Sequence, residues 1–251
     1  MPAIPVAEKK EVKIGDWLSE AIRLTTENLG PHLLLGLVGG VILIVGLGTV
    51  AGGLIVIMPL MCGMFYYAKK RMLKMPADLS DIFRGFDIFN ECLVASLIIL
   101  VYIVILGFVG FIIHLVVWVI GFRCCLAFLI YLPLILASLF MGAAFWGFID
   151  LIPGLLFERR MKAWDAIQLN IAFAFKNFWM ITLYGIVVSL IGLLGIAVTC
   201  GIGIIIVVPF SMFAGTIVYR EWVGFIDEAQ TPTTEAQTPA PDTMGGGQPV
   251  G

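Results

Sequence analysis

Four long stretches of this chain contain no Lys, Arg, Asp or Glu, and they limit its fold more than any other feature. They cover residues 31–68, 92–122, 124–149 and 177–219. A helix needs about 20 apolar residues to cross a hydrocarbon layer about 30 Å thick. The chain is 61% hydrophobic and 13% charged, whereas a soluble domain is about a quarter charged. A soluble globular domain is therefore excluded, and a multi-span membrane protein is expected.

Glycine-containing turns divide these apolar stretches. The first stretch breaks at 48–53, the last breaks at 199–203, and the middle two meet at 121–125. Glycine punctuates a helical pattern, so each division predicts a tight turn between two spans. We predict an all-α, polytopic membrane helical bundle with six transmembrane helices arranged as three hairpins. The spans are expected near residues 31–48, 53–70, 93–120, 125–149, 178–198 and 204–219.

The Lys and Arg residues predict how the six spans are oriented. If the N-terminus is cytoplasmic, 14 of the 15 basic residues lie in inner segments and Arg123 alone lies in an outer turn. Cytoplasmic loops retain positive charge during insertion, so this arrangement is strongly favoured. It places the C-terminus and all 17 acidic residues on the cytoplasmic side as well. The outer turns are too short to hold a folded domain.

The two ends of the chain differ from its apolar middle. The segment before the first span lacks the apolar core of a signal peptide, and residues 1–14 are expected to be a short cytoplasmic segment. Residues 227–251 are rich in Thr, Pro, Gln and Gly without apolar periodicity, which predicts a disordered cytoplasmic tail. The six-span membrane domain then covers residues 15–226.

An amphipathic segment precedes each predicted hairpin. Apolar residues recur there at helical spacing, which predicts interfacial helices that lie in the membrane plane. The three sets are Leu18, Ala21, Thr25 and Leu29; Leu79, Ile82, Phe83, Phe86, Phe89 and Leu93; and Trp164, Ile167, Ile171, Phe175 and Phe178. Asp78 is the predicted N-cap of the second helix, with Asp81 in its first turn. These helices either clamp the bundle or bind lipid headgroups or a partner.

The first and last units share residues at matching positions. Asn28 and Asn177 precede the two hairpins at an offset of 149, and Pro59 and Pro209 follow at an offset of 150. Four spans lie between equivalent points, so both units enter the membrane in the same direction. The middle unit shares the layout without the proline spacing, and an origin from three units stays open. The pattern predicts a parallel repeat of residues 16–70 and 160–220.

Three prolines fall inside predicted spans. Pro59, Pro133 and Pro209 are candidate helix-break sites, because proline removes a backbone hydrogen bond and frees a carbonyl group. Transporters bind substrates at such breaks. A purely structural kink is the alternative, since proline is common in membrane helices.

The predicted spans carry few groups that could do chemistry. The four uncharged stretches contain no Asp, Glu, Lys or Arg by definition, and His32 and His114 are the residues in them that could titrate near neutral pH. The sequence has no phosphate loop, nucleophile elbow or zinc-ligand spacing. We therefore assign no catalytic, cofactor-binding or metal-binding residue, and we predict that the protein is not an enzyme.

The five cysteines divide between the two sides of the membrane. Cys62 lies in a span and Cys92 at the inner interface, and both are expected to be reduced and inert. Cys124, Cys125 and Cys200 fall on the outer side, where a disulfide can persist. A bridge from Cys124 or Cys125 to Cys200 is a candidate disulfide.

Two runs in the first half of the chain resemble the signatures of a known family. Residues 59–67 and 78–86 look like the Pro-Leu-x-x-Gly and Asp-Leu-Phe-x-Gly-Phe motifs of uncharacterised bacterial and archaeal six-span membrane proteins, including YciC-like proteins. Ile82 replaces the usual Leu of the second motif. The resemblance covers residues 14–223. It implies a helical, multi-pass protein of the bacterial or archaeal cytoplasmic (inner) membrane, and it supplies no activity.

Two classes of function fit these features. The bare outer face, the uncharged spans and the interfacial helices favour a non-enzymatic accessory protein or scaffold, or a subunit of a membrane complex. The repeat and the prolines favour the alternative, a permease or lipid-handling transporter. The expected partners are membrane lipids and other membrane subunits or a second copy of the chain, and nucleic acid is not expected.

Overall fold

The computed structural model describes residues 13–121, 127–199 and 201–226, and these residues form helices without strands. A helix satisfies its backbone hydrogen bonds internally, which a chain this apolar requires wherever water is excluded. The helices are α1 (Ile14–Glu27), α2 (Leu29–Leu47), α3 (Val50–Met72), the 3-10 helix η1 (Leu79–Ile88), α4 (Phe89–Gly121), α5 (Ala127–Ile149), α6 (Ile152–Phe157), α7 (Ala163–Lys176), α8 (Phe178–Val198) and α9 (Ile204–Trp222).

Five segments of the described chain are long and apolar enough to cross a membrane. They are Leu29–Gly46, Leu79–Val116, Leu136–Phe157, Phe178–Val198 and Ile204–Trp222. These segments agree with the all-helical, multi-pass membrane protein expected from the sequence. The third segment runs beyond the predicted end of the span at 149, as far as Phe157.

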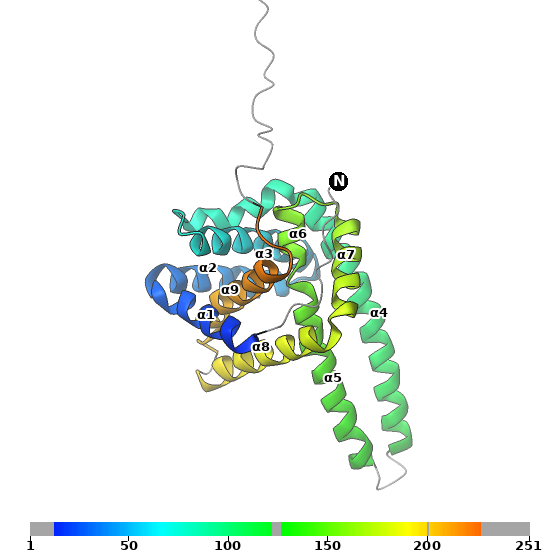
Figure 1. Cartoon of the computed structure of the whole chain (residues 1–251). Helices are drawn as coiled ribbons and strands as arrows, with labels where there is room; N and C mark the ends of the chain where they lie inside the picture. The colour runs from blue at the N-terminus through cyan, green and yellow to red at the C-terminus, as the bar shows by residue number, and fades with distance from the viewer. Residues whose placement is uncertain (1–12, 122–126, 200, 227–251) are drawn as a thin grey trace, which may run out of the picture.

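The long helices pack in a cyclic order. Each of α2, α4 and α8 contacts the helix that follows it in the chain, α3, α5 and α9 respectively. In addition α2 packs against α9, α4 packs against α3, and α8 packs against α5. In addition α3 contacts α6 and α9, and α9 lies in the middle of the other helices (Figure 1).

The helix η1 lies tightly on α3. A side-chain Cβ at Gly63 of α3 would overlap the carbonyl group of Ile82, and one at Gly85 of η1 would overlap the carbonyl group of Pro59. Both contacts are with backbone, which cannot rotate away as a long side chain can. Glycine at both positions therefore permits the close approach, as small residues do between membrane helices.

The amphipathic segments form helices, and their packing faces are more varied than the spacing predicts. Residues 79–88 form a 3-10 helix that leads directly into α4. Asp78 is its N-cap as expected, and the backbone N–H of Asp78 donates to Asp81 Oδ2 in the first turn at 2.8 Å. In α7 the buried residues are Ala163, Ala166, Ile167, Asn170, Phe173 and Ala174. Trp164 and Phe175, from the predicted apolar stripe, are exposed.

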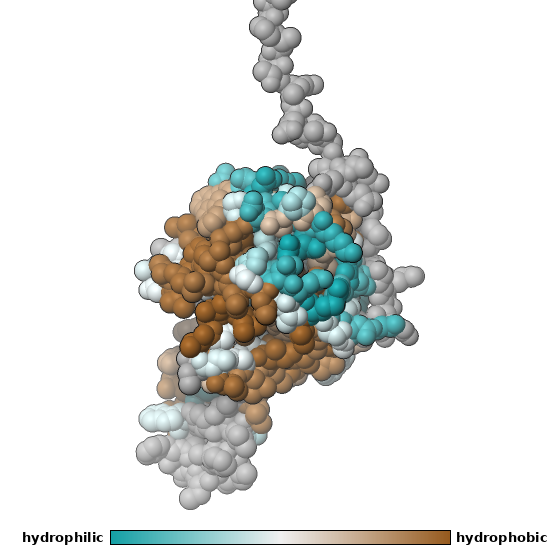
Figure 2. Space-filling view, turned by 90° about the vertical axis from the view of Figure 1, so that its left-hand side faces the viewer, coloured by the Kyte–Doolittle hydropathy of each residue, from teal (hydrophilic) through white to brown (hydrophobic). Residues whose placement is uncertain are grey.

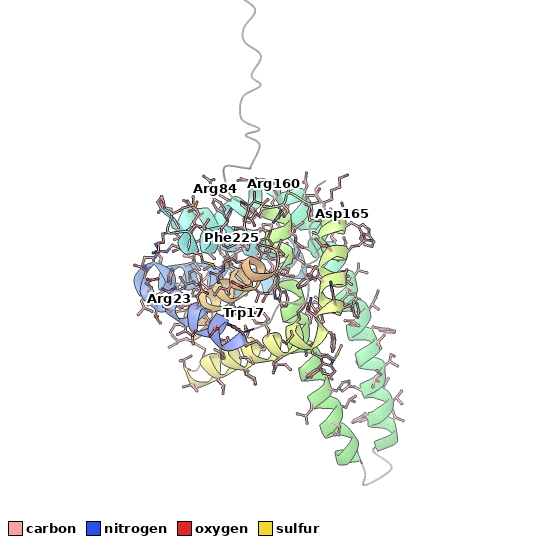
Figure 3. The ribbon with its side chains drawn as sticks, in the orientation of Figure 1. Trp17, Arg23, Arg84, Arg160, Asp165 and Phe225 are labelled. Carbon is pink, nitrogen blue, oxygen red and sulfur yellow. The ribbon has the colours of Figure 1, made fainter. Side chains whose placement is uncertain are left out.

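The outer surface of the molecule is largely apolar. Figure 2 shows a broad hydrophobic face bordered by hydrophilic residues along the top of the view. The pair α4 and α5 extends away from the other helices (Figure 1), and Phe108 and Phe111 on α4 are more than 60% exposed. Arg84 and Arg160 lie at the opposite end of the molecule from the tip of this pair (Figure 3).

Candidate functional site

A buried ion pair joins the C-terminal ends of α3 and α6. Lys69 is the first of three basic residues that end α3, and Glu158 follows the last residue of α6. Lys69 Nζ lies 2.9 Å from Glu158 Oε1, and the two side chains are only 9% and 5% exposed. Charges this deeply buried must be paired, because each loses its hydration shell. The ion pair therefore ties two helices that are 89 residues apart in sequence.

The segment that follows α9, residues 223–226, covers this ion pair. The backbone N–H of Ile226 donates to Glu158 Oε1 at 2.9 Å, and Lys69 Nζ donates to the carbonyl oxygen of Ile226 at 3.3 Å. Arg159 Nη2 donates to the carbonyl oxygens of Val223 and Gly224 at 3.3 and 3.1 Å. Gly224 has a φ of +79°, a left-handed conformation that glycine adopts without steric cost.

Aromatic rings enclose the same group of charges. Lys69 Nζ lies 5.8 Å from the centroid of the Phe225 ring, and Phe65 and Tyr219 make an edge-to-face contact at 4.8 Å. Phe225 is found in the middle of the helices in Figure 3. We call Lys69, Glu158, Arg159 and the covering segment 223–226 the inner polar centre. Lys69 Nζ and Glu158 Oε1 pair with each other and with backbone groups of Ile226, whereas Glu158 Oε2 and Arg159 Nε are buried without a hydrogen-bond partner among the described residues. The contacts tie α3, the end of α6 and the segment after α9 together, which suits a structural lock.

A second polar site, which we call the deeper site, lies at the turn between α5 and α6. Asp150 and Leu151 form a turn between the two helices, and Pro153 stands at the start of α6. Proline has no N–H to continue the helix and its ring clashes with the carbonyl group four residues earlier, which accounts for the interruption. Tyr184 of α8 donates its hydroxyl hydrogen to Asp150 Oδ2 at 2.8 Å.

Glycine makes room for the Asp150 carboxyl group against α9. A Cβ at Gly215 would lie 3.2 Å from Asp150 Cγ and 3.4 Å from Oδ2. The ring of Tyr184 is itself buried and meets Trp17 of α1 edge to face at 6.4 Å. Two helices distant in sequence, α8 and α9, thus contact a carboxyl group that belongs to the α5–α6 turn, and α1 packs on the tyrosine that binds it.

Two further ion pairs fasten the amphipathic helices to the bundle. Lys70 Nζ lies 2.8 Å from Asp81 Oδ2 on η1. Arg220 donates to both carboxylate oxygens of Glu20 on α1, each at 2.8 Å. Such a bidentate pair is stronger and better oriented than a single hydrogen bond. The hydrogen bond from Arg220 lowers the pKa of the Glu20 carboxyl group below its ordinary value.

The cysteines expected to be reduced lie together in the interior. Cys62 and Cys92 are free and fully buried, and their Sγ atoms are 3.5 Å apart. The candidate disulfide residues Cys124, Cys125 and Cys200 lie outside the described residues.

The candidate prolines lie inside continuous helices, and both histidines lie within hydrogen-bond distance of backbone carbonyl groups. Pro59, Pro133 and Pro209 lie inside α3, α5 and α9, and each helix continues on both sides of its proline. His32 Nδ1 lies 3.0 Å from the carbonyl oxygen of Thr25, and His114 Nδ1 lies 2.8 Å from that of Gly110. Within the described residues no group of three or more His, Cys, Asp or Glu side chains is placed to hold a metal ion.

An apolar groove opens between α2 and the turn that joins α8 to α9. It has a volume of about 470 Å³. Leu33, Leu34 and Leu37 line one side of the groove, and Thr199, Ile202, Gly203, Ile205 and Ile206 line the other. This lining suits a hydrocarbon chain and offers little to a hydrophilic solute.

The predicted span at 125–149 ends just before Asp150, and no sequence feature brought Asp150 together with Tyr184 or Gly215. Asp150 seemed to end a span, yet the apolar run from Leu151 to Phe157 continues after it. That run is the signal that the helix resumes and that the carboxyl group lies within an apolar segment. No such signal marks Tyr184 or Gly215, because their relation to Asp150 exists only in three dimensions.

Comparison with protein-family models, with curated proteins and with solved structures gave no match. The function is therefore argued from the geometry of the chain itself.

Proposed function

We propose that this protein is a six-span integral membrane protein, with α2 to α5, α8 and α9 as the spans. The sixth span is α3, which has 23 residues and carries its charged residues in its last turn. The three pairs of consecutive spans form hairpins, and α1, η1 and α7 lie at the inner interface ahead of them. The basic residues place both termini in the cytoplasm, and the resemblance to bacterial and archaeal six-span proteins supports the cytoplasmic membrane.

The cyclic contacts support an arrangement of three related units around the inner polar centre. In each unit the first span packs on the second span of the preceding unit, as α2 does on α9, α4 on α3, and α8 on α5. At two of these three contacts between units, an ion pair also joins the second span to the interfacial helix of the next unit. Lys70 of α3 pairs with Asp81 of η1, and Arg220 of α9 pairs with Glu20 of α1. This layout extends the parallel repeat of 16–70 and 160–220 to the middle unit.

In this membrane protein we assign a non-enzymatic accessory or scaffold function within a larger membrane complex. The observation that carries it is the α4–α5 pair, which leaves the bundle (Figure 1) and exposes apolar side chains at successive positions of α4, such as Val104, Ile105 and Phe108. At 33 residues, α4 is about 50 Å long, longer than the hydrocarbon layer is thick. A Cβ at Gly107, Gly110 or Gly142 would meet no atom within 4 Å, and small residues of this kind line helix contacts in membranes.

Site-directed photocrosslinking in intact membranes tests this function. A photoreactive phenylalanine analogue replaces Phe111 on α4 or, as a matched control, Leu193 on α8, since both side chains are more than 60% exposed. The scaffold function predicts one protein adduct of fixed mass from position 111 and none from position 193. Lipid adducts alone at position 111 contradict it.

The second candidate, a lipid-handling transporter, is favoured by the apolar groove. Its apolar lining from α2 and from the α8–α9 turn suits an acyl chain. A ligand in this groove gains binding free energy mainly by burying apolar surface. Native mass spectrometry compares lipid retained by the wild type with that retained by Leu37→Trp, which fills the groove. Equal retention argues against this candidate, and Leu136→Trp on exposed α5 surface is the matched control.

A further inference from the structure

Asp150 is a carboxyl group inside an apolar segment. It belongs to the segment Leu136–Phe157, which is long and apolar enough to cross a membrane. Seven residues separate it from Phe157 at the inner end, which corresponds to about 10 Å along a helix. Ionisable residues at such depth are rare and default to a functional role.

The surroundings of Asp150 provide a hydrogen-bond donor and no positive charge. Tyr184 is the titratable group that contacts it, and α9 presents Gly215 to the other side. Trp17 of α1 packs on the Tyr184 ring. Among the described residues no Lys, Arg or His side chain lies within ion-pair distance of Asp150.

Basic residues at the ends of the neighbouring helices have other partners. Lys69 pairs with Glu158, Arg159 donates to the carbonyl oxygens of Val223 and Gly224, and Arg220 of α9 pairs with Glu20 and Glu221. None of them compensates a charge on the α5–α6 turn. An isolated carboxylate in an apolar setting is so unfavourable that it takes up a proton instead.

We propose that Asp150, held by Tyr184, is a reversible proton-binding site. One carboxylate oxygen accepts a proton from the inner side while the Tyr184 hydroxyl continues to donate to Oδ2, and no other bond forms or breaks. Asp150 is half-buried as a residue rather than fully enclosed by the neighbouring helices. A metal cation fits less well, because Mg²⁺ and Ca²⁺ require six or more oxygen ligands and the described contacts supply a carboxylate and a phenol. This inference does not depend on the scaffold function.

The test is carbodiimide labelling of the full-length protein in lipid nanodiscs. Dicyclohexylcarbodiimide is apolar and modifies protonated carboxyl groups, whereas a water-soluble carbodiimide reports exposed ones. Peptide mass mapping across about pH 5 to about pH 9 is expected to show Asp150 labelled by the apolar reagent, with labelling decreasing as the pH rises. The exposed Glu27 and Asp87 are labelled by the water-soluble reagent and serve as the internal control.

Two variants keep the proposal falsifiable. Asp150→Asn imitates the protonated form, so it is expected to unfold at the same denaturant concentration as the wild type and to lose the label at position 150. Tyr184→Phe removes the donor that stabilises the carboxylate, so labelling is expected to persist to higher pH. Absence of apolar labelling at every pH, or an Asp150→Asn variant that unfolds far more easily, overturns the proposal, because either result indicates a permanently charged structural carboxylate.

Discussion

Breaking the buried ion pair of the inner polar centre is expected to destabilise the protein strongly. At the observed Lys69 to Glu158 separation of 2.9 Å and an effective dielectric constant of about 20, Coulomb's law gives about 6 kcal/mol of attraction. Dehydration of both groups offsets much of this in the intact pair. Glu158→Gln removes the attraction and leaves the ammonium group buried, a loss that typically amounts to about 3–5 kcal/mol.

The unfolding free energy in mixed detergent and SDS solutions measures this loss. The double variant Lys69→Met and Glu158→Leu removes both charges, so it is expected to lie within about 2 kcal/mol of the wild type. The matched control is Glu27→Gln, whose pairing with Arg23 spans 3.9 Å between side chains 64% and 56% exposed and is worth at most about 0.5 kcal/mol. If Glu158→Gln is no more harmful than this control, the reasoning is refuted.

Three further results are expected. The Glu20 carboxyl group, whose pKa is lowered by Arg220, contributes stability that is fully present above its unfolded pKa and lost as pH falls through its folded pKa. The stability difference between wild type and Glu20→Gln should therefore shrink on acidification, and a pH-independent difference would contradict it. Gly63→Ala should destabilise the protein by about 1–3 kcal/mol, because the added Cβ overlaps the backbone of η1. The same unfolding assay compares it with the control Gly107→Ala, whose added Cβ meets no atom within 4 Å. Buried Cys62 and Cys92 should react with maleimide after unfolding and not before, as thiol counting by mass spectrometry will show, whereas reaction of the folded protein would argue against their burial.

The helices were predictable because they depend on local composition. Uncharged runs such as 177–219 must form helices in a medium that offers no hydrogen bonds, and glycine-containing turns such as 199–203 show where they reverse. The packing faces of the interfacial helices were harder to predict, since the spacing of apolar residues alone does not say which face contacts the bundle. Phe175 belongs to the predicted apolar stripe of its helix and is exposed, whereas Asn170 is buried.

The sequence did not predict which residues meet at the polar sites. Lys69 and Glu158 were both counted as charges of inner segments, and nothing in their local sequence indicates that they meet. Asp150 could have been placed inside an apolar segment from the run that follows it. Its partner Tyr184 could not, because 34 residues and two helices separate them in the chain.

The sequence by itself determined that this chain is helical and apolar enough for a membrane, and its basic residues predict which side each turn faces. Those properties follow from hydropathy and charge summed over each segment, and they do not depend on which helix neighbours which. Only the tertiary structure decided that Lys69 meets Glu158 and that Asp150 meets a tyrosine rather than a cation. The cause is the packing order of the helices, which sets the surroundings of each buried charge.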